Sequence, residues 1–153
     1  MKFKDIVRSD YFYLILLIFV LGCFFRFTAF YNNVYDIYGD ECNSISSVLR
    51  PIKEIFLYFD EGANFLPLYA LMLKFIKTAF GFNWILFRLT SLIPSLISLI
   101  LFYVILERLF ENKVIKASIL FLFAISDSLI FYSKMIKPYS LDVMLCLLIL
   151  VNA

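Results

Sequence analysis

Two adjacent carboxylates, Asp40 and Glu41, follow Tyr38-Gly39 in a polar stretch that comes directly after the first long apolar run. An apolar neighbourhood at a membrane surface can raise the pKa of one carboxyl group, which suits it to act as a general base toward a hydroxyl group. Acidic residues are also favoured in the first turn of a helix, which is a structural role. The pair by itself leaves both roles open.

Two lysines, Lys134 and Lys137, precede Pro138-Tyr139-Ser140 where two apolar runs are separated. On the outer side of a membrane they oppose the positive-inside trend, and an anionic partner such as a lipid phosphate explains them. Ordinary snorkelling is the alternative. Asp127 and Asp142 lie near the ends of the two apolar runs, where we expect either a functional role or pairing with Lys134 or Lys137.

The composition indicates which kind of scaffold must position these groups. Of 153 residues, 63% are hydrophobic, 20% aromatic and 17% charged, whereas soluble domains are about 45–50% apolar. The chain is therefore predicted to be an all-α, polytopic bundle of transmembrane helices. A net charge of +2, with the basic residues beside apolar runs, gives no indication of a nucleic-acid partner. Three cysteines without zinc spacing and no histidine predict neither a disulfide framework nor a metal centre.

Four apolar stretches predict about four membrane spans, at residues 11–31, 84–106, 114–132 and 139–153. The first has no small-residue cleavage site and is interpreted as an uncleaved anchor, with Arg26 snorkelling at its far end. In the second, three serines spaced for one helix face predict close helix packing: Ser91, Ser95 and Ser98. The chain ends inside an apolar run, which indicates the N-terminal portion of a larger membrane domain.

The connection over residues 32–83 is predicted to be an outer, acidic loop with interfacial helices. Apolar residues from Ser44 to Phe59 have helical spacing, interrupted by Pro51. Residues 65–80 form an apolar helix of roughly 24 Å, which is shorter than the hydrocarbon core of about 30 Å. We therefore expect this helix to lie along the outer interface or to re-enter without crossing.

Basic residues predict the topology. Three of them crowd one short loop (Arg108, Lys113 and Lys116), as three others crowd the N-terminus (Lys2, Lys4 and Arg8), and both groups are expected on the cytoplasmic side. An even number of crossings must separate them. The loops that carry Asp40-Glu41 and Lys134–Tyr139 then meet on the outer face of the cell (inner or plasma) membrane.

Five short motifs follow one another along nearly the whole chain: Asp40-Glu41, Leu66-Pro67-Leu68-Tyr69 leading to Phe80-Gly81, Arg88-Leu89-Thr90-Ser91, Arg108-Leu109-Phe110, and the segment from Tyr132 to Leu141 with Lys137-Pro138-Tyr139. Their order resembles the N-terminal third of GT-C-fold glycosyltransferases that use polyprenyl-phosphate sugars. This superfamily includes the protein O-mannosyltransferases and the lipid A aminoarabinose transferase.

The resemblance implies an inverting glycosyl transfer at the outer membrane face, from a polyprenyl-phosphate-linked sugar to a hydroxyl group of a lipid, glycan or protein acceptor. It implies Asp40 and Glu41 as the catalytic pair, with Asp40 as general base, and Lys137 and Lys134 as ligands of the donor phosphate. Three further residues are expected in the substrate pocket: Tyr69, Tyr139 and Arg88. No metal is required by this scheme, although a carboxylate pair facing a phosphate suits Mg²⁺ or Mn²⁺.

Members of that superfamily carry more spans and usually a C-terminal outer domain, so this portion alone is expected to be inactive. The alternative function belongs to another class: a transporter or a small structural membrane subunit. In that case Asp127 and Asp142 would serve a polar pathway or helix pairing.

Overall fold

The chain is all-helical over the residues that the computed structural model describes, which are 3–57 and 67–153, the side chains of residues 3–9, 40, 56 and 57 excepted. Within them lie eight helices: α1 (Phe3–Asn32), α2 (Gly39–Leu49), α3 (Ile52–Leu57), α4 (Pro67–Phe80), α5 (Trp84–Leu109), α6 (Lys113–Ala124), α7 (Asp127–Ser133) and α8 (Tyr139–Asn152). Leu66, the first residue of the second motif, lies outside the described residues.

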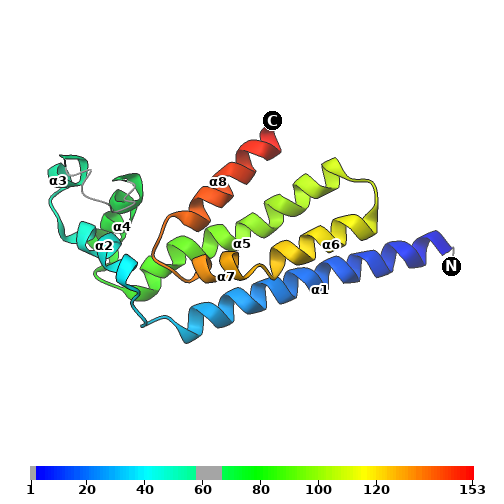
Figure 1. Ribbon diagram of the computed structural model, residues 1–153, viewed down its shortest axis with the longest axis horizontal. Coiled ribbons are helices and arrows are strands. Elements are labelled where there is room, and N and C mark those ends of the chain that lie inside the picture. The colour runs from blue at the N-terminus through cyan, green and yellow to red at the C-terminus, as the bar shows by residue number, and fades with distance from the viewer. Residues whose placement is uncertain (1–2, 58–66) are drawn as a thin grey trace.

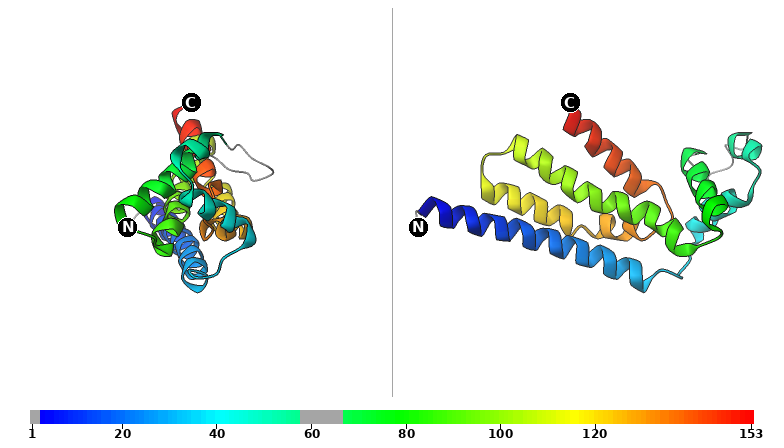
Figure 2. Two further views of the ribbon diagram at one scale, coloured as in Figure 1. Left: turned by 90° about the vertical axis from the view of Figure 1, so that its left-hand side faces the viewer. Right: turned by 180° about the vertical axis from the view of Figure 1, so that it is seen from behind.

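The helices form an elongated bundle with two unlike ends (Figure 1). The long helices α1 and α5 run along it with α6 between them, while α2, α3 and α4 gather at one end (Figure 2). The N-terminus and the turn between α5 and α6 lie at the opposite end. The basic N-terminal segment and the basic turn thus share one end of the molecule, and the two polar loops share the other. We call the end formed by α2, α3 and α4 the head.

Two helical segments are long and apolar enough to cross a membrane, Asp10–Asn32 and Trp84–Leu109. The predicted third span over residues 114–132 is not one straight helix, because α6 and α7 meet at a bend of 48°. Counted together, the bent pair gives a third span. Helix α8 has 14 residues, or about 21 Å, so the structure confirms an all-helical protein with membrane spans without confirming four of them.

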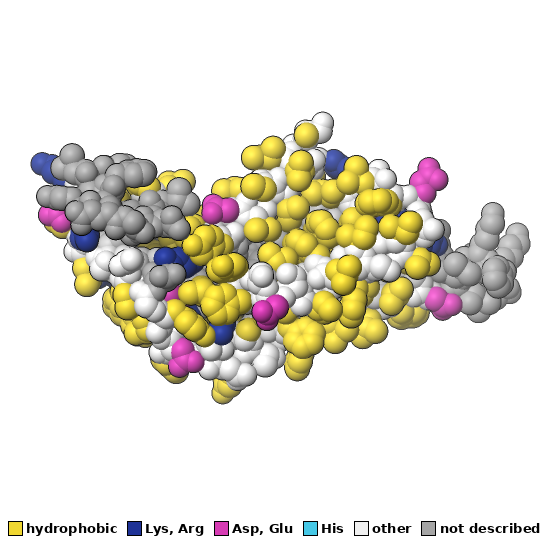
Figure 3. All heavy atoms as spheres, viewed as in Figure 1, with side chains coloured by type: hydrophobic (Ala, Val, Ile, Leu, Met, Phe, Trp, Pro, Cys, Tyr) yellow, Lys and Arg dark blue, Asp and Glu magenta, His cyan; other side chains and the backbone are white. Residues whose placement is uncertain are grey.

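The packing between α1, α5 and α6 forms one core. Buried side chains from all three helices meet there: Ile15, Ile18, Leu99, Leu106 and Leu120. Gly22 permits the closest approach, since a Cβ atom at this position would lie 3.2 Å from both the Cβ of Ala124 and a methyl group of Leu99. The face of the bundle in Figure 3 carries many hydrophobic side chains and few charged ones, as a membrane environment requires.

A second core fills the head. It joins α2, α4, the start of α5 and the loop before α8 through five buried residues: Val48, Tyr69, Leu73, Phe87 and Ile136. The predicted interfacial helix over residues 44–59 begins earlier, at Gly39, and is divided into α2 and α3 at Arg50-Pro51. Proline lacks the N–H that an unbroken helix requires, which explains the division. Helix α4 has 14 residues and belongs to the head.

Arg26 does not snorkel toward the interface. Its side chain is completely buried; Nε donates a hydrogen bond to Ser95 Oγ (2.8 Å), and Nη1 donates to the carbonyls of Gly22 (3.0 Å) and Ala124 (2.8 Å). Ala124 ends α6, and the carbonyls of a final turn lack partners within their own helix and attract positive charge. Arg26 therefore caps α6 at the bend, which accounts for a charged residue inside this apolar run.

Candidate active site

Helix α2 places the Asp40-Glu41 pair at its first turn. Tyr38 is the N-cap residue and Glu41 occupies the third helical position, from which its Oε2 accepts a hydrogen bond from the Tyr38 backbone N–H (3.0 Å). A Glu at this position commonly satisfies the N-cap N–H in this way. The helix-start role considered for the pair is therefore present at Glu41. The backbone of Asp40 lies in the same turn, and its side chain lies outside the described residues.

Glu41 forms a buried ion pair with Arg88 of α5. The two hydrogen bonds measure 3.0 Å and 3.1 Å, and both side chains are completely buried. Glu41 Oε1 also accepts the backbone N–H of Ile136 (2.6 Å). Arg88 in turn donates to the carbonyls of Val34 (3.1 Å), Asp36 and Lys134. One ion pair thus joins the end of α1, the start of α2, α5 and the segment before α8.

This network determines what Glu41 can do. Its two carboxylate oxygens are engaged by Arg88 and by two backbone N–H groups, which satisfies the buried carboxylate. Removing one partner of such a pair leaves an uncompensated buried charge. The geometry fits a positioning role for Glu41 and Arg88.

A pocket of about 350 Å³ opens beside the start of α2. Its lining comes from both polar loops: Tyr38, Gly39, Phe131, Tyr132, Met135, Lys137 and Tyr139. At Gly39 a Cβ atom would meet nothing within 4 Å, so the backbone of α2 is open to the pocket there. Asp40 is the next residue along the chain. We call this the head pocket.

The two predicted phosphate ligands have different surroundings. Lys137 lines the head pocket with 6% of its surface exposed, and its ammonium group has no hydrogen-bond partner among the described residues. Lys134 donates to the hydroxyl of Tyr38 (2.8 Å) and lies 5.1 Å from the ring centres of both Tyr38 and Phe131. Lys137 is therefore the lysine that faces the pocket, while Lys134 supports its wall.

Hydrogen bonds connect Tyr69 of α4 to the same segment. Its hydroxyl lies 2.9 Å from Thr90 Oγ1 and 3.4 Å from Ser91 Oγ, and Ser91 donates to the carbonyl of Lys137 (2.9 Å). Burial raises the pKa of Tyr69 to about 12, so its hydroxyl keeps its proton at neutral pH. Tyr69 therefore positions α5 and the Lys137 segment, and it lines a groove beside α8 instead of the head pocket.

An apolar groove of about 500 Å³ lies between α4 and α8. Apart from Asp142 and Tyr69 its walls are hydrophobic: Leu68, Leu71, Met72, Pro138, Leu141 and Leu145. Pro138 belongs to this groove, whereas its neighbours Lys137 and Tyr139 belong to the head pocket. A polar pocket and an apolar groove therefore lie along one short chain segment.

Glu41 offers a poor fit to Mg²⁺ or Mn²⁺, because its oxygens are already engaged by Arg88 and by backbone N–H groups. No group of three or more possible metal ligands occurs in the part of the chain that the structure describes. The expected pairing of Asp127 or Asp142 with a lysine is wrong for these residues, because the ion pairs within residues 3–57 and 67–153 join Arg88 to Glu41 and Lys116 to Glu107.

The predicted site residues collect at the head, although they come from four separate parts of the sequence. Tyr132, Met135 and the backbone N–H of Ile136 also belong to the site, and only their place in the fifth motif marked them.

Comparison of the chain with protein-family models, with curated proteins and with solved structures finds no match.

Proposed function

We propose that the protein takes part in transferring a sugar from a polyprenyl-phosphate donor to an acceptor hydroxyl group at the membrane surface. One observation carries the proposal: Lys137, almost fully buried, faces a pocket that begins at Gly39, directly beside Asp40. Such a transfer needs a cation for the leaving phosphate and a base for the acceptor hydroxyl, and the pocket brings Lys137 close to the backbone turn that carries Asp40.

Lys137 would stabilise the negative charge of the leaving group, the polyprenyl phosphate. When the bond between the anomeric carbon and the phosphate oxygen breaks, negative charge collects on the polyprenyl phosphate. A preorganised cation in a partly dry pocket stabilises that charge better than water does. Lys137 suits this role because its backbone carbonyl is held by Ser91 and its ammonium group has no partner among the described residues.

The apolar groove between α4 and α8 would take the first prenyl units of the donor. A polyprenyl phosphate is a charged head on a hydrocarbon chain, and burial of such a chain against Leu68, Met72 and Leu145 is favourable. Because Pro138 lines the groove and Lys137 lines the head pocket, one short segment could hold both parts of this ligand.

Asp40 would act on the acceptor. It would take the proton of the acceptor hydroxyl while the oxygen attacks the anomeric carbon from the face opposite the phosphate, so that the configuration at that carbon inverts. Glu41 would not contact the acceptor, since its oxygens are engaged by Arg88 and backbone N–H groups. It would instead fix the register of α2 and therefore the place of Asp40.

The experiment that tests this proposal measures sugar transfer from radiolabelled polyprenyl-phosphate sugars in membranes containing the protein as the cell makes it. Lys137→Gln removes the charge, keeps a polar side chain and should reduce transfer at least tenfold. Lys53→Gln is the matched control, because Lys53 is an exposed lysine of α3 in the same head. Equal transfer by the unaltered protein and Lys137→Gln contradicts the role of Lys137, and absence of transfer with every donor favours a transporter or structural subunit.

A further inference from the structure

Helix α4 is apolar on two opposite faces. One face packs into the core of the head through Tyr69, Ala70 and Leu73, which are buried. The other face carries Leu68 and Phe75, which lie seven positions apart on one side of the helix and are 75% and 69% exposed. A helix at a water-covered surface is polar on its outer face, whereas a helix that is apolar all round is buried in protein or in a membrane. The exposed face of α4 therefore needs an apolar cover.

The two lysines of α4 lie away from this exposed face. Lys74 is about 100° around the helix from Phe75, and its ammonium group donates to the carbonyls of Val48 (3.5 Å) and Arg50 at the end of α2. Lys77 is about 200° from Phe75 and is half-buried. The face that carries Leu68 and Phe75 thus has no charged side chain, which fits hydrocarbon as its cover.

A second apolar groove, of about 380 Å³, lies between α4 and α5. Met72 and Ile76 of α4 line it together with Leu86, Leu89 and Ile93 of α5. The hydroxyl group of Thr90, which also lines it, is engaged by the carbonyl of Phe87 (2.6 Å) and the hydroxyl of Tyr69 (2.9 Å). We call this the α4–α5 groove, and its walls suit a hydrocarbon chain.

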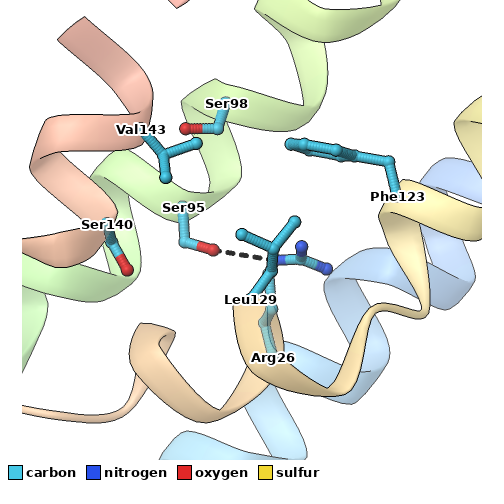
Figure 4. A pocket seen from close by; sticks show the side chains of 7 residues that line it. All are labelled: Arg26, Ser95, Ser98, Phe123, Leu129, Ser140 and Val143. Carbon is cyan, nitrogen blue, oxygen red and sulfur yellow. Dashed lines mark hydrogen bonds between the residues drawn. The ribbon is translucent and has the colours of Figure 1, made fainter. Parts of the chain in front are cut away.

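The α4–α5 groove is continuous with the outward face of α5. Beyond Ile93, two further exposed isoleucines, Ile97 and Ile100, follow on the same face. Figure 4 shows the opposite face of α5, where Ser95 and Ser98 line the interior of the bundle and Ser95 accepts a hydrogen bond from Arg26 (2.8 Å). Since α5 is long and apolar enough to cross a membrane, its exposed isoleucines face lipid, and the groove opens onto the same lipid.

Helix α4 runs across the long axis of the bundle instead of along it (Figure 2). Where it leads into α5, the rings of Phe82 and Trp84 pack with their centres 4.9 Å apart, and tryptophan is typical of a membrane interface. We propose that α4 lies in the plane of the interface, with Leu68 and Phe75 among the lipid chains, and that a hydrocarbon chain of a membrane lipid occupies the α4–α5 groove. This inference does not depend on the sugar transfer proposed above.

The test uses tryptophan fluorescence, because the protein has a single tryptophan, Trp84. Leu68→Trp and Phe75→Trp, each combined with Trp84→Phe, are reconstituted into phosphatidylcholine vesicles whose acyl chains carry bromine either near the headgroup or near the terminal methyl group. Bromine near the headgroup should quench both tryptophans to a similar extent, and more strongly than bromine near the methyl group. Ser46→Trp in the same background is the control, since Ser46 is exposed beside Asn43 in α2, and it should keep its fluorescence in both vesicles.

Two results would overturn the position of α4. Unquenched tryptophans at positions 68 and 75 would mean that water or protein covers this face. Quenching of one position mainly near the headgroup and of the other mainly near the methyl group would mean that α4 enters the membrane core end-on. Both positions are exposed, so either variant leaves the core of the head in place and provides the test if the other fails to fold.

The groove is tested separately by Leu89→Trp with Trp84→Phe. A lipid chain in the α4–α5 groove brings bromine into contact with this half-buried position, so its fluorescence should fall in brominated vesicles. Full fluorescence at position 89, in vesicles that quench position 75, would mean that membrane lipid does not enter the groove and would contradict this part of the inference.

Discussion

Glu41 and Arg88, 47 residues apart in the sequence, form an ion pair of 3.0 Å in which both side chains are completely buried. The pair connects the first turn of α2 to α5, and through Arg88 to the carbonyl of Lys134. Of the two carboxylates that the resemblance implies as a catalytic pair, Glu41 is therefore the one that joins these helices. Its neighbour Asp40 is left as the candidate base.

The first prediction concerns this ion pair. Glu41→Gln should lower the free energy of unfolding by about 3–5 kcal/mol, because it leaves the Arg88 charge buried without a counter-charge. Arg88→Lys should also destabilise the protein, since an ammonium group cannot replace the guanidinium bonds to two carboxylate oxygens and three carbonyls. Unfolding in a denaturing detergent measures both effects. Glu54→Gln in α3 is the control, and similar stabilities of Glu54→Gln and Glu41→Gln would argue against a positioning role.

The second prediction concerns the close approach of α1 to α5 and α6 at Gly22. A Cβ atom there would already lie 3.2 Å from Leu99 and Ala124, so Gly22→Val should overpack the core and lower the free energy of unfolding by about 1–3 kcal/mol. Val20→Leu, on an exposed face of the same helix, should leave stability unchanged. Thermal unfolding of the purified proteins distinguishes the two, and a tolerant Gly22→Val would mean that the helices lie farther apart.

The third prediction concerns topology. Cys42 is exposed in α2, and Phe80 and Glu111 are exposed at the head and at the opposite end. In variants that carry one cysteine, at position 42, 80 or 111, with Cys23 and Cys146 replaced by alanine, a membrane-impermeant maleimide should label positions 42 and 80 in intact cells. Position 111 should react only after permeabilisation. Labelling of positions 42 and 80 from opposite sides would mean that α4 crosses the membrane.

Hydropathy and backbone chemistry predicted much of the fold. The second span was expected over residues 84–106 and runs over Trp84–Leu109; the break at Pro51 and the buried serine face of α5 are also present. These features depend on local properties, namely a run of apolar residues, a missing N–H and small side chains at helical spacing. Such properties act over a few residues and can be read directly from the chain.

The features that the sequence did not predict depend on contacts between residues far apart along the chain. The residues next to Arg26 in the sequence do not reveal that its side chain is buried. Its partners Ser95 and Ala124 lie 69 and 98 residues away. The bend between α6 and α7 has the same origin, because the last carbonyl of α6 is satisfied by Arg26 instead of by a further helical turn. The sequence alone gives no sign of this cap, and so it predicts one straight span over residues 114–132.

The structure brings the residues of the motifs together at the head, among them Glu41, Arg88, Lys137 and Tyr139. The sequence did not predict which carboxylate would pair with Arg88. That choice follows from where the side chain of Arg88 in α5 reaches, which is the first turn of α2. Glu41 at the third helical position lies toward Arg88, and a residue one position earlier lies about 100° away around the helix.

The central claim is that Asp40 is the general base of a sugar transfer. The measurement that tests it most directly is the rate of transfer from a radiolabelled polyprenyl-phosphate sugar, compared between membranes that contain the unaltered protein and Asp40→Asn at equal protein levels, with Glu54→Gln as the control. We expect a loss of about 10²–10⁴-fold for Asp40→Asn, an unchanged unfolding midpoint, and normal transfer by Glu54→Gln. Transfer by Asp40→Asn at the rate of the unaltered protein would contradict it.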